Sequence, residues 1–142
     1  MTRLHHTNIR ITDPARSLQF YRTFGFKHLG TAALAPGYTL LFLGTDPAEA
    51  TLELVVNENV DETYDRSPGA GHIGIEVDDL DAALAALGGL GVEPEAPPAH
   101  PLGRTDLNPV AFVRDPDGVR VELLQAPWPL PQDTVPDELA GL

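Results

Sequence analysis

Two histidines stand side by side near the start of the chain, in the stretch RLHHTNIRI that covers residues 3–11. The stretch alternates as a β-strand does, so successive side chains point to opposite faces and only one of the two histidines can look into a given site. His6 shares its face with Asn8 and Arg10, whereas His5 falls on the apolar face of the strand. This pattern predicts that His6 does chemistry and that His5 is a structural or edge residue, whose loss would leave a bound metal almost untouched.

An internal repeat connects His6 with three further residues. A shift of 66 positions places His6 on His72, and a shift of 69 positions places Glu53 on Glu122. Repeats that align residue by residue indicate duplication more strongly than a similar order of elements does. Each half of the chain therefore supplies one histidine and one glutamate at matching positions.

The residue types of this set are those that bind a divalent metal ion. Imidazole and carboxylate are the strong ligands that remain, because the chain has no cysteine. Two histidines and two glutamates would fill tetrahedral zinc, so an ion that also binds substrate is expected to be close to octahedral, which favours Ni²⁺ or Co²⁺ and leaves Zn²⁺ with expanded coordination as the alternative. The sequence thus predicts a metal site made of His6, Glu53, His72 and Glu122.

The elements that must position these ligands follow one order in both halves. In the first half a strand is followed by a helix with Asp13 as its N-cap and Pro14 at its first position, and then by three strands. The second half repeats this order, and its last two strands form a hairpin closed by the sequence PDG. The pattern predicts an α+β fold of two tandem βαβββ modules, each a curved mixed sheet with a helix on its outer face. The expected strands cover residues 5–12, 26–34, 38–44, 51–57, 71–77, 92–96, 109–115 and 119–125, and the expected helices cover 14–24 and 78–90.

Module boundaries follow from the same repeat. We expect an N-terminal module over residues 1–66, a C-terminal module over 67–126 and a proline-rich tail over 127–142. The tail is expected to be mainly a loosely ordered extension, with one tryptophan that can dock it. A proline-rich loop over 95–108 is either a lid or binding loop or a plain surface loop.

The charge of the chain limits its partners. Nine basic and 21 acidic residues give a net charge of −12, which repels phosphate backbones and anionic membrane surfaces. Nucleic acid and membranes are therefore not expected as partners, and an anionic small molecule would need basic residues close to its site. The absence of a signal sequence and of a long apolar run leads us to expect a soluble, cytoplasmic protein.

Several motifs carry a resemblance to a known family. They are HTNIRITDPARSLQFY, YTLLFLG, ATLELVVN, GHIGIEVDD and VAFVRDPDGVRVELL, of which the last is particularly specific. With these motifs the chain resembles glyoxalase I (lactoylglutathione lyase) in its short bacterial form, within the vicinal oxygen chelate superfamily. The resemblance extends from about Leu4 to Gln125.

The resemblance implies roles for particular residues. His6, Glu53, His72 and Glu122 match the metal ligands of the family, and Glu122 also matches its catalytic base. A second set matches the residues that hold glutathione or lie in the substrate loop, namely Arg10, Asn57 and Arg104. Family members are homodimers with sites at the subunit interface, so that His6 and Glu53 of one subunit would join the histidine and glutamate of the other half from its partner.

The implied reaction converts the hemithioacetal of methylglyoxal and glutathione, or a related thiol, into the 2-hydroxyacyl thioester, and so detoxifies methylglyoxal. Dioxygenases and thiol-transferring resistance enzymes of the superfamily use two histidines and one glutamate, so Glu53 argues against both. Two alternatives stay open. One is an acyl-CoA epimerase, which also abstracts a proton beside a metal, and the other is a non-catalytic drug-binding protein, which does not need four ligands.

Overall fold

The computed structural model describes residues 2–58, 69–139 and 141. They divide into a first unit, Met1–His6 with His72–Pro129, and a second unit, Thr7–Gly71 with Leu130–Leu142. The module boundaries after residues 66 and 126 stay a prediction. Along the chain the elements are β1 (Arg3–Arg10), α1 (Pro14–Arg22), β2 (Lys27–Ala35), β3 (Tyr38–Gly44), β4 (Leu52–Asn57), β5 (Gly69–Val77), α2 (Leu80–Gly88), η1 (Pro101–Gly103), β6 (Val110–Arg114), β7 (Arg120–Gln125) and η2 (Asp137–Leu139).

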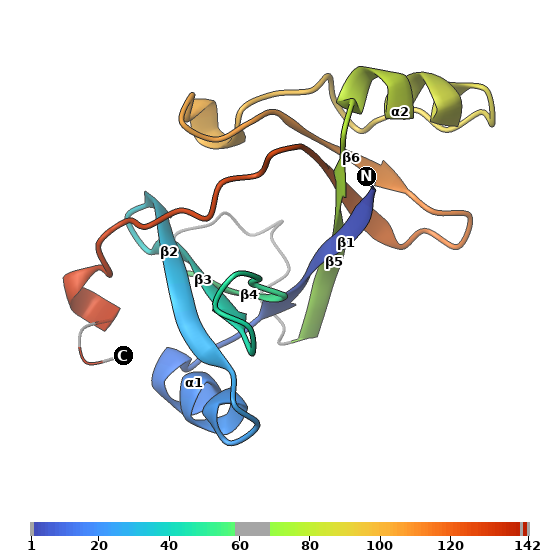
Figure 1. The fold of residues 1–142 in the computed structure, drawn as a ribbon. Coiled ribbons are helices and arrows are strands. Elements are labelled where there is room, and N and C mark those ends of the chain that lie inside the picture. Colours follow the sequence, from blue (N-terminus) through green and yellow to red (C-terminus); the bar gives the residue numbers. More distant parts are fainter. Residues whose placement is uncertain (1, 59–68, 140, 142) are drawn as a thin grey trace. The chain divides into compact units, whose positions relative to one another are not determined.

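In the second unit the strands lie in the order β2-β3-β4-β1 (Figure 1). β1 is parallel to β4 and the other pairs are antiparallel, so the sheet is mixed. Helix α1 begins as the sequence predicts, because the Asp13 carboxylate accepts a hydrogen bond from the backbone N–H of Arg16 at 3.2 Å and Pro14 needs no partner at the first helical position. The helix buries Leu18 against a cluster from the sheet, formed by Leu41, Leu43 and Leu54.

The first unit repeats this arrangement with its own helix. Its strands lie in the order β5-β7-β6, with β5 parallel and β6 antiparallel to β7. Asp79 caps α2 by accepting from the backbone N–H of Ala82 at 3.0 Å. The helix packs on a buried cluster made of Val77, Leu80, Ala111, Val113, Val121 and Leu123. A mixed sheet with one helix in each unit confirms the predicted α+β class.

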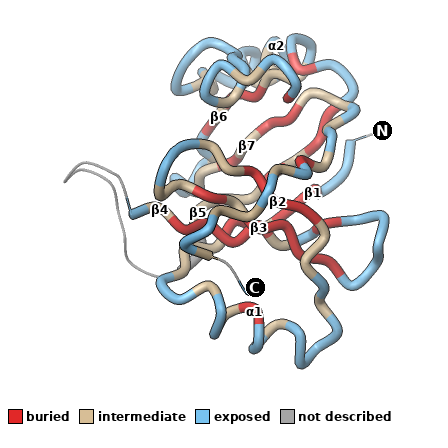
Figure 2. Tube along the Cα trace, turned by 90° about the vertical axis from the view of Figure 1, so that its left-hand side faces the viewer, coloured by how far each residue is buried: buried red, intermediate tan, exposed pale blue. Residues whose placement is uncertain are grey.

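Burial follows the same plan in both units. Figure 2 shows the buried positions concentrated in the strands, while the helices are mostly exposed or intermediate. Each helix has nine residues, and no helix in the described part of the chain is long and apolar enough to cross a membrane. One face of each sheet packs against the helix of its unit. In the second unit the other face carries Glu53 together with a further apolar cluster around Phe42.

One predicted strand is wrong. Residues 92–96 form no strand, because Pro94 within the segment and the prolines that follow it have no N–H to donate to a ladder. The segment still follows β6 loosely, since the Glu95 N–H donates to the carbonyl of Phe112 at 2.8 Å and Ala99 forms an isolated bridge with Val110. The second half of the repeat thus keeps the path of the first half without its full hydrogen bonding.

The repeat is visible in the register of the strands that carry the two glutamates. Glu53 on β4 stands opposite one residue of β1 and one residue of β3, and Glu122 on β7 stands opposite one residue of β5 and one residue of β6. The flanking residues are Asn8 and Phe42 for Glu53, and Gly74 and Phe112 for Glu122. Both glutamates therefore sit at the same place in their own sheets.

The tail differs from its expectation, because residues 130–133 are ordered along the edge of β2 (Figure 1). The Thr31 N–H donates to the carbonyl of Pro131 at 3.0 Å, and the Asp133 N–H donates to the carbonyl of Thr31 at 2.9 Å. The carboxylate of Asp133 accepts from the Ala33 N–H at 2.9 Å. Gly30 permits this approach, because a Cβ there would lie 2.9 Å from a side-chain carbon of Leu130. An edge that would otherwise offer unpaired groups is thus covered.

We expect Asp133→Ala to lower the free energy of unfolding by about 1 kcal/mol, since it removes the acceptor of the half-buried Ala33 N–H. Asp137→Ala is the matched control, because Asp137 is an exposed aspartate of the same tail. Urea denaturation followed by circular dichroism measures both variants. Equal stability of the two would show that the hydrogen bond from Ala33 to the Asp133 carboxylate contributes nothing.

Candidate metal centre

Three of the four predicted ligands converge in the first unit. The two imidazole Nε2 atoms of His6 and His72 are 3.2 Å apart. The Oε1 atom of Glu122 is 3.5 Å from the first and 3.7 Å from the second. All three side chains are buried or nearly so, with exposed fractions of 1% for His6, 10% for His72 and 13% for Glu122.

These separations suit one divalent ion. Ligand atoms about 2.1 Å from a common ion, at tetrahedral or octahedral angles, lie about 3.0–3.4 Å from one another. The observed separations of 3.2, 3.5 and 3.7 Å need only small side-chain adjustments to meet that range. Two imidazoles with one carboxylate are also a donor set that transition metals prefer. The residues present therefore fit a metal ion.

A glycine makes room for the cluster. His6 lies on β1, His72 on β5 and Glu122 on β7, and Gly74 of β5 lies directly across from Glu122. A Cβ on Gly74 would lie 2.6 Å from Nδ1 and 2.9 Å from Nε2 of His6, closer than side-chain atoms approach. Only glycine at this position lets the His6 ring lie against β5.

Burial sets the protonation of the cluster. It lowers the pKa of His6 to about 4, with the second imidazole adding to the effect and the Glu122 carboxylate opposing it. Burial raises the pKa of Glu122, against the opposing charges of His6 and Arg120. His6 is therefore neutral at physiological pH, as a metal ligand must be, and Glu122 is more basic than an exposed glutamate.

The hairpin of β6 and β7 backs the cluster with an aromatic ring. Phe112 meets His72 edge-on, with ring centroids 5.3 Å apart, and the guanidinium carbon of Arg120 lies 3.7 Å over its face. Glu95 fixes that guanidinium through hydrogen bonds of 2.9 and 3.2 Å. Arg120 shares a face with Glu122 two residues further along β7, so it is the cation that partly offsets the carboxylate.

Glu53, the fourth predicted ligand, belongs to the second unit. It is 6% exposed, and its Oε1 atom accepts a 2.7 Å hydrogen bond from the Asn8 side chain, directly across from it on β1. A buried carboxylate at this place in the sheet, held by a neutral amide, is a competent ligand. Its participation in the metal centre stays a prediction.

The residues expected to hold the thiol lie in different surroundings. Arg10 and Asn57 end β1 and β4 in the second unit, and among the described residues the buried Oδ1 atom of Asn57 has no hydrogen-bond partner. Arg104 follows η1 in the first unit, where its guanidinium makes a two-point ion pair with Asp106 at 2.7 and 3.1 Å. This pair lowers the pKa of Asp106. Their roles in substrate binding stay predictions.

His5 is not an edge residue. It is 8% exposed, and its Nδ1 atom lies 2.9 Å from Nδ1 of His6. Strand alternation places the two side chains on opposite faces, but ring nitrogens close to the backbone can still meet. His5 is thus a structural residue in contact with a predicted ligand, and the expectation that its loss would leave a bound metal almost untouched stays untested.

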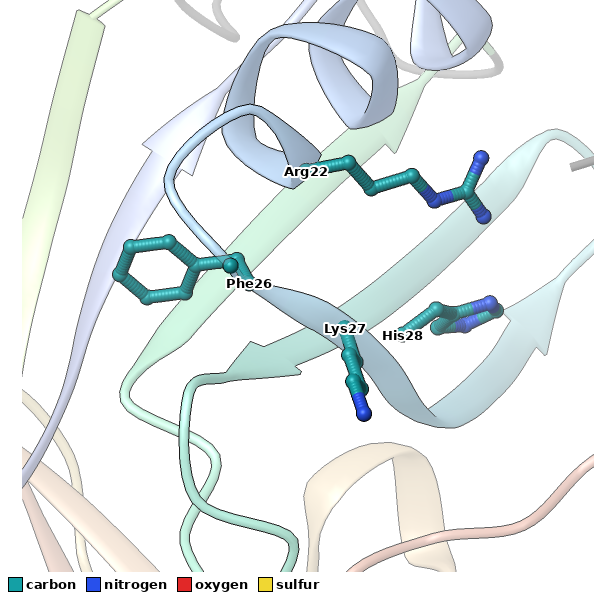
Figure 3. Close-up of a pocket in the computed structure, with 5 residues that line it drawn as sticks. Arg22, Phe26, Lys27 and His28 are labelled. Carbon is teal, nitrogen blue, oxygen red and sulfur yellow. The ribbon is translucent and has the colours of Figure 1, made fainter.

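A cavity of about 490 Å³ lies at the junction of α1 and β2 in the second unit. Figure 3 shows the side chains of Arg22 and His28 on the same side of it, while Lys27 and Phe26 point away from both. Burial lowers the pKa of His28, so the ring adds no charge at neutral pH. The basic groups of this cavity do not point toward a common position, so the cluster around His6 is the better candidate for a functional site.

Comparison with known proteins decides the family. The model of the Glyoxalase/Bleomycin resistance protein/Dioxygenase superfamily matches residues 3–123. The chain belongs to this superfamily. The protein named lactoylglutathione lyase in Salmonella typhimurium is 38% identical over 130 residues, which cover 87% of this chain and 93% of that protein. These findings confirm the resemblance and place the chain among enzymes whose named relatives are lyases.

Solved structures share the fold. A hypothetical protein of Bacillus halodurans has a TM-score of 0.71 and 22% identity, with 96% of this chain and 99% of that chain covered. A variant of methylmalonyl-CoA epimerase from Streptomyces coelicolor, in complex with 2-nitronate-propionyl-CoA, has a TM-score of 0.69 and 24% identity, with 89% and 99% covered. At these identities the likeness shows the glyoxalase-type fold alone.

Four residues that contact these side chains were given no role in a site by sequence reasoning: His5, Asn8, Gly74 and Phe112. A glycine inside an apolar strand is itself a signal of close backbone approach, so the position of Gly74 could have been noticed. The others carry no such signal. The contacts of Asn8 and Phe112 arise between strands, and the contact of His5 with His6 joins side chains that strand alternation places on opposite faces.

We expect Gly74→Ala to displace the His6 ring and to weaken the binding of Co²⁺ or Ni²⁺ by at least about tenfold, because the added Cβ would occupy the place of the ring. Isothermal titration calorimetry of the metal-free protein measures the metal affinity. Gly88→Ala, at the end of α2 where a Cβ meets nothing within 4 Å, is the control and should bind as the wild type does. Unchanged affinity in the Gly74 variant would contradict the proposed ligand role of His6.

Proposed function

We propose that the protein is a metal-dependent lactoylglutathione lyase, which isomerises the hemithioacetal of methylglyoxal and glutathione, or a related thiol, to S-lactoylglutathione or the corresponding thioester, and so detoxifies methylglyoxal. The observation that carries the proposal is the buried cluster of His6, His72 and Glu122 in a chain 38% identical to proteins of that name. The expected ligand set adds Glu53. Ni²⁺ or Co²⁺ is favoured, with Zn²⁺ as the alternative.

The reaction moves a proton between neighbouring carbons without net oxidation. The proton leaves the carbon that bears sulfur, an enediolate forms, and the proton returns to the adjacent carbon to give the 2-hydroxyacyl thioester. A bound divalent ion supplies Lewis-acid stabilisation of the negative charge that develops on the substrate oxygens.

Glu122 is the proposed base of this transfer. Its buried carboxyl has a raised pKa, which makes it a better proton acceptor than an exposed glutamate. A single carboxylate that takes the proton from one carbon can return it to the next. The cation of Arg120 lies on the same strand face and partly opposes this rise in the pKa of Glu122.

Binding of the thiol falls to the predicted cationic and amide groups. Glutathione carries two carboxylates, and a chain with a net charge of −12 must offset its own field near the site. Arg10, Asn57 and Arg104 are the residues proposed for this task. The Oδ1 atom of Asn57, which has no partner among the described residues, supports it, because a buried amide oxygen is suited to an N–H donor of a ligand.

Two alternative functions can be distinguished from the lyase by experiment. An acyl-CoA epimerase would also use a carboxylate base beside a metal, and the likeness to the Streptomyces coelicolor epimerase is one of fold. A non-catalytic drug-binding protein would bind an aromatic ligand without metal. Elemental analysis of protein purified without added metal separates the second from the enzymes. A thioester absorbance assay with methylglyoxal and several thiols then separates the lyase from the epimerase.

We expect Glu122→Gln to remain folded and to lose isomerisation by about 10²–10⁴-fold, because an amide cannot accept the proton. Because folding raises the pKa of Glu122, this residue adds to the free energy of unfolding at acidic pH, and the contribution is lost as the pH rises through the raised pKa. The metal-free variant should therefore melt no lower than the wild type at pH 7. Glu93→Gln, at an exposed position, is the control, and near-normal turnover by the Glu122 variant would refute the assignment.

We further propose that the protein is a homodimer with sites at the subunit interface, as its family implies. In that arrangement His6 and Glu53 of one subunit act with the other two ligands from its partner. The same contact between His6, His72 and Glu122 is present within the single chain. Exchange of segments between subunits preserves such contacts, so both arrangements can bring the same side chains together.

Mixing two inactive variants, His6→Ala and Glu122→Gln, tests this exchange. If subunits share sites, half of the sites in each mixed dimer carry no substitution, and statistical mixing should restore about a quarter of wild-type activity. Unfolding and refolding the variants together, followed by the thioester assay, measures the recovery. No recovery from a dimeric mixture would mean that the ligands of each site come from one chain.

A further inference from the structure

A second histidine lies directly behind the metal-facing histidine, and neither the family motifs nor the proposed reaction uses it. His5 is 8% exposed, and its ring stands edge-on to that of His6, with centroids 5.1 Å apart and planes at 87°. The contact joins Nδ1 of one ring to Nδ1 of the other at 2.9 Å. A hydrogen bond at this distance requires one nitrogen to carry a proton and the other to lack it.

The position of the cluster decides which nitrogen carries the proton. Nε2 of His6 faces Nε2 of His72 at 3.2 Å and the Glu122 carboxylate at 3.5 Å, so Nε2 is the nitrogen that would bind the metal. A nitrogen that binds metal has no proton, and the proton of neutral His6 is then on Nδ1. The acceptor of that N–H is Nδ1 of His5, whose own proton must be on Nε2.

We propose that His5 is a positioning residue for the metal centre: it accepts the hydrogen bond of the His6 Nδ1–H and thereby holds the His6 ring with Nε2 toward His72 and Glu122. The inference rests on the metal centre of the proposed function. Metal-binding histidines in general donate their second N–H to a carboxylate, a carbonyl or water, and loss of that acceptor typically costs about 10–100-fold in metal affinity. In this chain the acceptor is the neighbouring histidine.

The surroundings of His5 supply a fixed framework. Glu76 of β5 is 8% exposed and accepts hydrogen bonds at both carboxylate oxygens, from Nε of Arg3 at 2.8 Å and from the backbone N–H of Trp128 at 2.8 Å. His5 lies close to this carboxylate. Glu76 is thereby fixed beside His5 by hydrogen bonds from two other segments of the first unit, at Arg3 and at Trp128.

Gly74 completes the geometry from the other side. The His6 ring lies over this glycine with no room for a Cβ, so the ring has β5 beneath it and His5 at its Nδ1 edge. The two constraints act on different degrees of freedom. Gly74 admits the ring, and the hydrogen bond to His5 sets which nitrogen points into the cluster.

Metal affinity of the full-length protein tests the inference. Co²⁺ is titrated into metal-free wild type, His5→Leu, His5→Gln and the control His28→Leu, in competition with a chelator. We expect His5→Leu to weaken binding by about 10–100-fold, because it removes the acceptor. His5→Gln keeps an acceptor oxygen and should recover most of the affinity. His28→Leu removes a half-buried histidine of the second unit, bonded to Thr31, and should bind as the wild type does.

A second readout does not depend on metal. The ¹⁵N chemical shifts of the His6 ring in metal-free protein report its tautomer. We expect the proton on Nδ1 in the wild type and in His5→Gln, and a mixture of tautomers in His5→Leu. If His5→Leu fails to fold, the wild-type spectrum decides: a proton on Nε2 of His6 would overturn the inference.

Two other outcomes would also overturn it. One is wild-type affinity in a folded His5→Leu variant, and the other is a His5→Gln variant that binds as weakly as His5→Leu. Failure of the proposed function has a different signature. If the wild type binds no divalent metal, the metal centre is refuted and the role of His5 with it. If the wild type binds metal but does not isomerise the hemithioacetal, the proposed reaction is refuted and the assignment of His5 is intact.

Discussion

The structure of the first unit depends on the placement of one imidazole ring almost out of contact with water. His6 is 1% exposed and has a carboxylate and a second imidazole within 3.5 Å. Polar groups withdrawn from water are costly unless each finds a partner. This requirement is met by Gly74, which leaves room for the ring, and by Nδ1 of His5, which lies 2.9 Å from the far nitrogen of the ring. Without them the ring could not stay buried and still present Nε2 to its neighbours.

A divalent cation at the cluster of His6, His72 and Glu122 would offset the electrostatic cost that burial creates. In the metal-free chain the Glu122 carboxylate has little hydration, which raises its pKa, and His6 cannot gain a proton to compensate, because burial lowers its own pKa to about 4. A metal ion brings positive charge without a proton and bonds to both groups. The acidic balance of the whole chain favours the approach of cations and disfavours that of an anionic thiol. Binding of an anionic substrate would therefore depend on local cations, whereas binding of a metal ion would agree with the field of the whole protein.

The duplicated sheets show how one backbone arrangement can be adapted twice. Glu53 and Glu122 occupy the same place in their strands, but the residue opposite on the neighbouring strand differs. The neutral amide of Asn8 donates a hydrogen bond to Glu53, whereas Gly74, opposite Glu122, has no side chain and leaves room for the His6 ring. The difference fits the proposed chemistry. A glutamate held by an amide is suited to remain a ligand, and a glutamate without that bond can be released to act as a base.

Sequence alone determined the features that depend on local pattern and on the repeat. Alternation and capping signals located the strands and the two aspartate N-caps, and the repeat selected His6, His72 and Glu122, which the structure brings together. The strand expected at 92–96 failed because Pro94 and the prolines after it remove ladder donors, a local signal that the repeat outweighed. The order of residues 130–133 could not be predicted, because it depends on β2, about a hundred residues away in the chain. The roles of His5 and Gly74 were also decided only by the tertiary structure. Strand alternation predicts the face of the sheet from which a side chain projects, but the approach of β1 to β5 determines which atoms come into contact.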